Sequence, residues 1–435
     1  MPLGEVIASS LNMRNTPSPE GPLLRILPKG TRISVLDTVS GGAYLFDGAT
    51  RDSWHRIAIG AETGFVAAAY VAEVRPAVQL RGAWIPDGRH SSALKTPAGI
   101  AEALDFLQEH GFNAVFPAVW NRGLTAFPSR VMERHGFAVQ DPQYEGFDPL
   151  GAIVREGKKR GMAVLPWFEY GFASSPDADG GPILRAKPAW AALDRSGALV
   201  RHGPLVWMNS LHPEVQQFVL DLVVEVIVTY DVQGIQGDDH WPAMPFNAGH
   251  DPLSLSEYRT AKGIDPPTDD REEGWVSYRS DRMTDYLGRI GRTVKQAKPG
   301  CLVSMAPTPF PTGRRELMQD SDRWMRKGLV DFLHPQLYRS DAAAYRRDLG
   351  IMMKGWSPTM RARLAPGITF TANGRDLPAA DIVAMVELNR ELGLAGEVLF
   401  HYGGLRRLDD FMAKTLVREA GYEELALLPS SFLVV

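Results

Sequence analysis

The stretch "YDVQGIQGDDHWP", Tyr230 to Pro242, places two adjacent aspartates, Asp238 and Asp239, before His240. Two carboxyls in one poorly hydrated site repel, so one keeps its proton as an acid while the other stays ionised. Glycoside hydrolysis needs this division of labour, with an acid at the leaving oxygen and a base or nucleophile at the anomeric carbon. The string "VLPWFEYGF" adds a third carboxyl, Glu169.

From Leu80 onward, short apolar stretches alternate with helical periods. The clearest helix has apolar residues at i, i+3, i+4 and i+7 after Pro213. The eight predicted strands are Gln79–Ile85, Ala114–Val119, Ala163–Glu169, Gly234–Asp238, Leu302–Ala306, Phe332–Tyr338, Leu364–Phe370 and Glu397–Tyr402. The predicted helices are Pro97–His110, Pro149–Arg160, Pro213–Tyr230, Tyr278–Gln296, Asp320–Lys327, Ala342–Lys354 and Ala379–Leu392. Eight such repeats, with no glycine-rich nucleotide turn after the first strand, predict a (β/α)₈ barrel rather than an open doubly wound sheet.

Barrel enzymes carry their chemistry where the strands end, so the residues at these ends are the candidates. Side-chain alternation predicts that Asp238 faces the barrel axis, whereas Asp239 reaches the site only if the strand has already ended. The candidate catalytic residues are Asp238, Asp239 and Glu169. The candidate substrate contacts are Trp84, Trp120, Asn121, Arg122, Trp167, Tyr170, His240, Trp241, His334, Gln336, Tyr338, His401 and Tyr402. Aromatic rings at strand ends suit the apolar faces of sugars.

Each candidate also has a purely structural interpretation. One aspartate could cap the loop after strand four while the other pairs with Arg122. Glu169 could form a structural salt bridge, and the aromatic residues could pack in the core. His240 could orient the loop, and the histidines of the last strands could be satisfied interior groups.

The first segment shows no helical period. Short strands in "RISVLD", "WHRIAIG" and "GFVAAAYV" are separated by turns such as "LPKG" and "SGG", which predicts a small all-β barrel. We therefore expect two domains, residues 1–76 and 77–435, with "EVRPAVQ" as the linker.

The composition narrows the class of partner. The 47 Lys and Arg against 51 Asp and Glu give a net charge of −4 with mixed signs, which argues against a nucleic acid partner. The single cysteine, Cys301, allows neither an internal disulfide nor a cysteine-rich zinc site and is expected to be buried. Neither a signal peptide nor a membrane span is predicted, so we expect a cytoplasmic protein or one released by lysis or phage-type export.

Several strings carry a family resemblance: "VFPAVWNRGLTAFPS", "VLPWFEYGF", "VWMNSLHPEVQQFV", "YDVQGIQGDDH" and "DFLHPQLYR". In this order they resemble the bacterial glycosyl hydrolase-like family 10. The resemblance implies a carbohydrate-active, endo-acting hydrolase barrel with its site at the "DDH" strand. Gly403 stands where the family pattern often has glutamate, which disfavours a strand-eight carboxylate. Similarly, "LNMR", "LPKG" and the late "GFV" resemble a bacterial SH3-like domain, which implies binding to cell-wall peptide or glycan.

The resulting hypothesis is a glycosidase that cleaves a cell-wall glycan, such as peptidoglycan, or an exopolysaccharide, without cofactor or metal. Either aspartate would be the general acid and Glu169 its partner. If the substrate carries an N-acetyl group, one aspartate could instead orient it for substrate-assisted catalysis. A metal-dependent carbohydrate deacetylase and a non-catalytic glycan-binding protein remain the alternatives.

Overall fold

The computed structural model describes residues 3–60, 62–74, 77–424 and 426–432. The chain divides into two compact units, residues 1–77 and 78–435, and each is described by itself. In the described residues no helix combines the length and apolar content that a membrane crossing requires.

The first unit is all-β. Its strands are β1 (Leu3–Val6), β2 (Ser10–Arg14), β3 (Leu23–Pro28), β4 (Arg32–Phe46), β5 (Ala49–Ile59), β6 (Glu62–Ala67) and β7 (Val71–Val74). They pair in the order β3-β2-β6-β5-β4-β1-β7, antiparallel wherever a register is defined. Met13, Trp54 and Val66 are buried in its own small core. The all-β expectation for this segment is confirmed.

The second unit is built on eight short parallel strands. They are β9 (Leu80–Ile85), β10 (Ala114–Pro117), β13 (Ala163–Val164), β17 (Gly234–Asp238), β18 (Leu302–Ala306), β19 (Phe332–Leu333), β20 (Gly367–Thr369) and β23 (Gly396–Phe400). One sheet has the order β13-β10-β9-β23-β20 and another β17-β18-β19. Parallel bridges join the two sheets at both junctions, Trp167 with Gln236 and Gln336 with Gly367. These bridges close the ring, which confirms the (β/α)₈ barrel.

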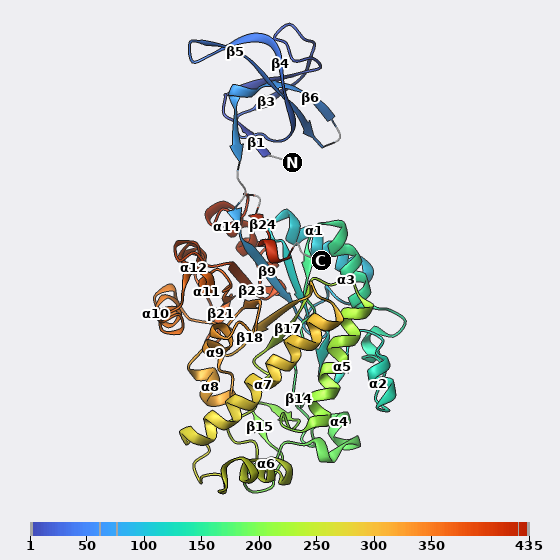
Figure 1. The fold of residues 1–435 in the computed structure, drawn as a ribbon. Helices are drawn as coiled ribbons and strands as arrows, with labels where there is room; N and C mark the ends of the chain where they lie inside the picture. The colour runs from blue at the N-terminus through green and yellow to red at the C-terminus, as the bar shows by residue number, and fades with distance from the viewer. Residues whose placement is uncertain (1–2, 61, 75–76, 425, 433–435) are drawn as a thin grey trace. The chain divides into compact units, whose positions relative to one another are not determined.

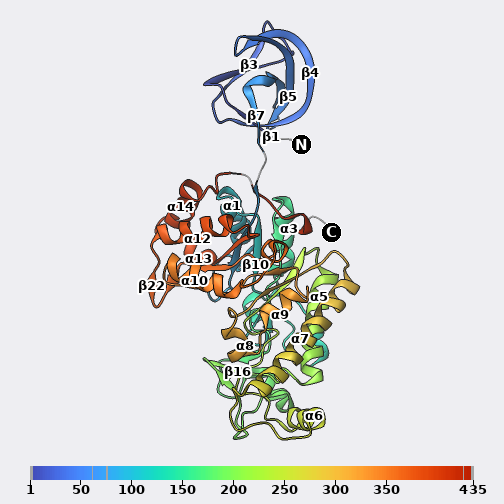
Figure 2. The same ribbon diagram turned by 60° about the vertical axis from the view of Figure 1, so that its left-hand side comes forward.

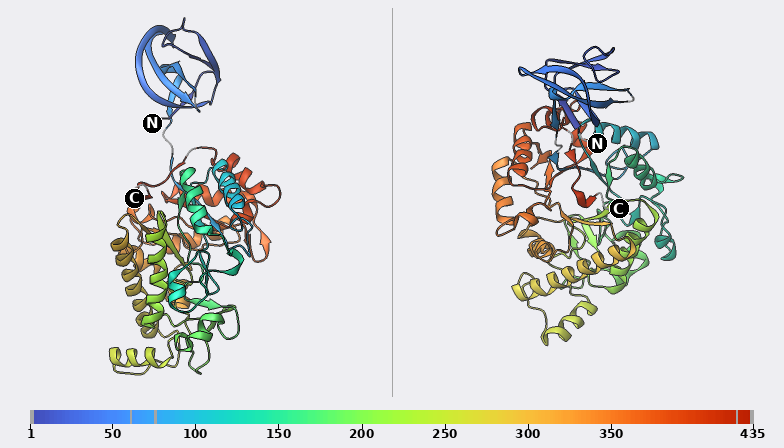
Figure 3. Two further views of the ribbon diagram at one scale, coloured as in Figure 1. Left: turned by 90° about the vertical axis from the view of Figure 1, so that its right-hand side faces the viewer. Right: turned by 45° about the horizontal axis from the view of Figure 1, so that its top comes forward.

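Helices surround this ring, as the right-hand view of Figure 3 shows. The main ones are α1 (Pro97–Glu109), α3 (Pro149–Lys159), α5 (Pro213–Thr229), α7 (Glu273–Ala297), α9 (Ser321–Arg326), α10 (Ala342–Met352), α12 (Ala379–Glu391) and α14 (Phe411–Glu419). The shorter or inserted ones are α2 (Arg130–Arg134), α4 (Gly181–Ala186), α6 (Pro252–Lys262), α8 (Thr312–Leu317), α11 (Pro358–Arg361) and α13 (Tyr402–Leu405). In Figures 1 and 2, α5 and α7 run side by side along one flank of the ring.

Local sequence explains where the clearest helix begins. Pro213 occupies the first turn of α5, and the ring of the preceding His212 accepts a hydrogen bond from the Glu214 amide. The apolar residues of the predicted stripe, among them Phe218 and Leu222, are buried. The helix expected from the spacing is therefore confirmed, and it ends one residue earlier, at Thr229.

Two parts of the barrel differ from the expectation. Regular pairing in strands three and six lasts only two residues each, and isolated bridges at Trp167 and Gln336 continue their course. Prolines 166 and 335 lack the amide hydrogen that would extend the ladder. Tyr402 does not end strand eight, because it begins α13.

Insertions at the strand ends complete the unit. The chain after strand three forms a small sheet of β14 (Ala173–Ser175), β16 (Leu205–Trp207) and β15 (Arg201–His202). Strand two is followed by the hairpin of β11 (Trp120–Asn121) and β12 (Leu124–Thr125), and strand seven by that of β21 (Thr371–Ala372) and β22 (Arg375–Asp376). These insertions lie on the carboxyl side of the strands, where the candidate residues are found.

Candidate active site

The paired aspartates lie where the fourth strand ends. β17 finishes at Asp238, so the backbone leaves the strand before Asp239, as the sequence required for this residue to reach the site. Gly237 serves close packing at this point. A Cβ there would lie 2.4 Å from the Trp241 carbonyl oxygen and 2.6 Å from Sδ of Met305. The absence of a side chain therefore lets the returning loop pack against the strand.

Asp238 is 2% exposed, and both of its carboxyl oxygens are engaged. The indole Nε1 of Trp167 donates to Oδ2 at 3.0 Å, and the His240 amide donates to Oδ1 at 2.8 Å. Burial raises the pKa of Asp238 to about 7. This carboxyl is thus fixed within the barrel mouth and has almost no surface with which to contact a substrate.

Glu169 follows the third strand and is partly exposed. The Asn121 side-chain amide donates to its Oε2 at 2.7 Å. Burial raises the pKa of Glu169 to about 8; the carboxyls of Asp238 and Asp87 add to this, whereas the Asn121 hydrogen bond opposes it. At neutral pH Glu169 therefore holds a proton that it could give to a leaving group.

His240 joins the two strand ends. Its Nδ1 donates to the Glu169 carbonyl oxygen at 2.8 Å and lies 3.4 Å from an oxygen of each of Asp238 and Asp239. Burial disfavours the charged ring, but the two aspartates outweigh it and raise the pKa of His240 to about 10. The imidazolium therefore neutralises part of the acidic charge of the site.

Asp239 is the more accessible aspartate, with its side chain 26% exposed. Its Oδ1 accepts a hydrogen bond from the Gln336 side-chain amide at 2.9 Å. Gln336 and Tyr338 come from strand six, and the Tyr338 ring stacks on Phe400 with centroids 5.2 Å apart. Strands three, four, six and eight therefore meet around Asp239.

The same residues form a group that could in principle hold a metal ion. One donor atom each of Asp238, Asp239 and His240 lies within 4.8 Å of the other two. Zinc needs the lone pair of a neutral imidazole. The Nδ1 of His240, which lies 3.4 Å from an oxygen of each aspartate, donates to the Glu169 carbonyl oxygen, and Asp238 directs both oxygens at N–H groups. These atoms are therefore already engaged in hydrogen bonds within the chain, and the metal-dependent deacetylase stays an untested alternative.

Comparison with known proteins identifies the family of each unit. The sequence profile of the family glycosyl hydrolase-like 10 matches residues 79–377. The chain belongs to this family. The profile of the bacterial SH3 domain matches residues 9–72, so the first unit is an SH3-like domain.

Curated relatives carry the same description. "Glycosyl hydrolase DigH" of Escherichia coli K12 is 27% identical over 299 residues, which is 62% of this chain and 64% of that protein. "Glycosyl hydrolase YngK" of Bacillus subtilis 168 is 24% identical over 375 residues, covering 76% of this chain and 69% of that protein. The chain thus spans less than two thirds of the length of the first relative.

Solved structures share the barrel at low sequence identity. The PgaB (BpsB) glycoside hydrolase domain from Bordetella bronchiseptica has a TM-score of 0.61 at 12% identity, over 81% of this chain and all of that one. Alpha-L-fucosidase isoenzyme 2 from Paenibacillus thiaminolyticus has a TM-score of 0.57 at 18% identity, and the match covers 80% of this chain and 49% of that one. At these identities the likeness concerns the fold alone.

Within this family member, four of the predicted substrate contacts are core residues. Trp84 is 1% exposed, and Trp120, Trp241 and His334 are 0% exposed. Trp120 donates to the Gly171 carbonyl oxygen. The Nδ1 of His334 donates to the Ala365 carbonyl oxygen at 2.9 Å inside the barrel, and burial lowers the pKa of this ring to about 4. The prediction that these four contact the substrate is wrong, because they have no surface to offer.

Two further predictions need correction. Trp167 is 4% exposed, and its indole N–H is spent on Asp238, so it positions that carboxyl instead of stacking on a sugar. Tyr402 is 7% exposed and packs edge-on against Phe106 of α1, with centroids 5.9 Å apart. Its ring therefore belongs to the helix layer outside the barrel.

The other predicted contacts keep their roles as predictions. Arg122 has a positive φ of 54° in the β11–β12 hairpin, and its buried Nε has no hydrogen-bond partner within the described part of the chain. The Tyr170 ring lies 6.1 Å from that of His240. His401 is partly exposed and accepts the Gly403 amide at the start of α13.

Three residues near the aspartates were not predicted. The Trp207 ring lies 5.5 Å from His240, and His202, on the same small inserted sheet, is close enough for Asp239 to influence its pKa, which burial lowers. Gln319 donates from Nε2 to the Asp238 carbonyl oxygen at 2.8 Å. These residues lie in insertions between the barrel elements, where no periodic pattern points to a strand end.

Proposed function

We propose that this chain hydrolyses glycosidic bonds in a bacterial envelope glycan, either the cell wall or an exopolysaccharide. The observation that carries the proposal is a pair of accessible carboxyls on adjacent strand ends, Glu169 and Asp239, of which Glu169 is protonated at neutral pH. Family membership supports the hydrolase class.

In this proposal Glu169 is the general acid. It transfers its proton to the glycosidic oxygen as the bond from that oxygen to the anomeric carbon breaks. Asp239 supplies the second carboxyl at the anomeric carbon. One water is consumed: its hydroxyl ends on the anomeric carbon and its remaining proton returns to the enzyme.

Asp238 acts as a positioning residue. Its carboxyl holds the amide of His240 and the indole of Trp167, so it fixes the turn from which Asp239 emerges. This differs from the sequence interpretation, in which either aspartate was the acid. The change follows from burial, because a side chain that is 2% exposed cannot present a proton to a sugar.

The substrate class is supported by the SH3-like domain, because its resemblance implies attachment to cell-wall peptide or glycan. We therefore propose that the first unit binds the polymer that the barrel cleaves. The route by which the protein reaches this polymer, by lysis or another release, stays a prediction.

The test is turnover of purified peptidoglycan sacculi and of poly-N-acetylglucosamine, followed by mass spectrometry of the soluble products. We expect product from the wild type and a loss of about 10²- to 10⁴-fold in kcat for Glu169→Gln and Asp239→Asn. Glu387→Gln, at an exposed position on α12, is the matched control and should keep the wild-type rate.

Two results would contradict the proposal. Wild-type rates in Glu169→Gln would remove Glu169 from the chemistry. If the wild type binds the glycans in a co-sedimentation assay but releases no product from either, the non-catalytic glycan-binding alternative is correct.

A further inference from the structure

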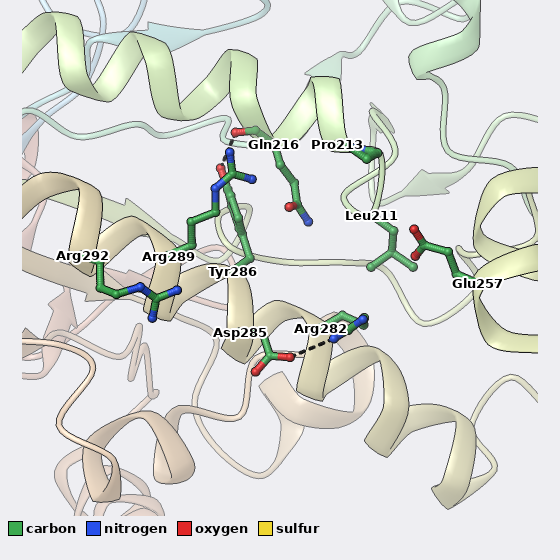
Figure 4. Close-up of a pocket in the computed structure, with 9 residues that line it drawn as sticks. All are labelled: Leu211, Pro213, Gln216, Glu257, Arg282, Asp285, Tyr286, Arg289 and Arg292. Atoms are coloured by element: carbon green, nitrogen blue, oxygen red, sulfur yellow. Dashed lines mark hydrogen bonds and ion pairs between the residues drawn. The ribbon is translucent and has the colours of Figure 1, made fainter. Parts of the chain in front are cut away.

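A cavity lies away from the candidate active site, between the start of α5, α6 and the middle of α7. Its volume is about 360 Å³, within the range typical of small-molecule sites. Figure 4 shows that Gln216 of α5 and Glu257 of α6 face a row of long side chains on α7 across this space. None of its lining residues takes part in the hydrolysis proposed above, so the cavity is independent of that function.

The row on α7 is strongly basic. Arg282, Arg289 and Arg292 all line the cavity, and spacings of seven and three residues place them on one face of the helix. Arg289 and Arg292 are about one turn apart, whereas Arg282 is about 15 Å from Arg292 along the axis. The cavity therefore extends along α7, and Arg289 and Arg292 both line one end of it.

The charges at the two ends are compensated differently. Arg282 forms an ion pair with Asp285 at 3.0 Å, so its charge is already matched. Among the described residues, Arg289 donates to the neutral side-chain amide of Gln217. For Arg292, the described residues provide neither an ion pair nor a hydrogen bond. Within the described part of the chain, no ion pair joins the guanidinium group of Arg289 or Arg292 to a carboxylate.

The polar wall beside these arginines is already fixed. The Tyr286 hydroxyl donates to the Gln216 carbonyl oxygen at 2.8 Å, and the Gln216 side-chain amide donates to the Ser210 carbonyl oxygen at 2.7 Å. Neither group supplies negative charge. Figure 4 shows Glu257, the other lining carboxylate, on the far side of the cavity beside Leu211.

We propose that this cavity binds a small molecule through an oxyanion, a phosphate or a carboxylate, held between Arg289 and Arg292. Guanidinium groups offer paired N–H donors that match the oxygen spacing of both anions. The remainder of the ligand extends along α7 toward Leu211 and Glu257. A hydroxyl-bearing skeleton such as a sugar suits that end, because Glu257 can accept hydrogen bonds from hydroxyl groups.

The experiment is isothermal titration calorimetry of the full chain with inorganic phosphate, glucose 6-phosphate, glucuronate and glucose at constant ionic strength. We expect saturable binding of at least one of the three anions and none of glucose. Comparison of glucose 6-phosphate with glucuronate distinguishes a phosphate ligand from a carboxylate ligand. Absence of saturable binding for all three anions would overturn the proposal.

Matched variants locate the binding. Arg292→Gln and the double variant Arg289→Gln/Arg292→Gln should weaken binding by about tenfold or more, because a hydrogen bond to a charged group is worth at least that factor. Arg292 has no described partner to lose, so its variant keeps the fold intact and the test valid. Arg346→Gln, an exposed arginine on α10, is the charge-matched control. Equal weakening in the control and the double variant would show general charge attraction and refute the site.

Discussion

The raised pKa of Glu169 makes a prediction about stability that needs no substrate. In the folded chain burial holds the proton on Glu169 up to about pH 8, whereas an unfolded glutamate loses it near pH 4.5. Stabilisation by the protonated form is therefore complete below pH 4.5 and is lost as the pH rises through about 8. Glu169→Gln cannot ionise, so the variant should escape this loss.

The magnitude follows from the two pKa values. Their difference corresponds to an upper limit of about 5 kcal/mol, and the partial exposure of the side chain reduces it through solvent screening. We expect Glu169→Gln to exceed the wild type by about 2 kcal/mol in unfolding free energy at pH 9. At pH 4.5 the two proteins should be nearly equal.

Urea denaturation at a series of pH values, followed by tryptophan fluorescence, measures this difference. Glu316→Gln is a control of opposite sign. The hydrogen bond from Arg271 lowers the pKa of Glu316, so its carboxylate stabilises the fold at pH values above the ordinary pKa of a glutamate. That variant should be less stable than the wild type at neutral pH. If the Glu169→Gln difference did not grow between pH 4.5 and 9, the inferred burial of the proton would be wrong.

Two further variants test the packing of the site. Gly237→Ala should lower the unfolding free energy by about 1–3 kcal/mol, because its Cβ would overlap the Trp241 carbonyl oxygen; an unchanged urea midpoint would contradict this contact. Trp120→Ala should lower it by about 3–5 kcal/mol through the cavity left in the core. A stable Trp120→Ala protein that had lost only glycan binding would instead restore Trp120 as a sugar contact.

The sequence predicts the barrel well because its signal is repeated. The long helices α1, α3, α5 and α7 bury apolar residues with a period that is visible in the chain, and α5 begins at the residue that its proline indicates. Strands three and six are less well predicted. Pro166 and Pro335 interrupt hydrogen bonding within apolar runs, and the closure of the ring then depends on isolated bridges between distant residues.

The sequence likewise predicts part of the candidate site and misses another part. Strand position locates Glu169, Asp239 and Gln336, since the carboxyl ends of parallel strands meet at one edge. The sequence does not show how deeply each side chain is buried. Trp120 and Trp241 follow strand ends, as a sugar contact would, but their rings turn into the helix layer and are fully buried. The burial of these rings depends on how the inserted segments pack, which no local pattern in the sequence predicts.

The buried tryptophans nevertheless bear on the chemistry. Trp84 and Trp167 lie with ring centroids 6.3 Å apart in the barrel interior, and the Trp167 indole donates to Asp238. The Trp84 indole donates to the side chain of Gln236, which precedes Asp238 by two residues on β17 and so lies on the same face of the strand. These rings exclude water from the floor of the site, and exclusion of water is the largest cause of the raised pKa values of Asp238 and Glu169. In the proposed function, the aromatic residues predicted to hold the sugar instead keep water away from the strand end where the carboxyls lie.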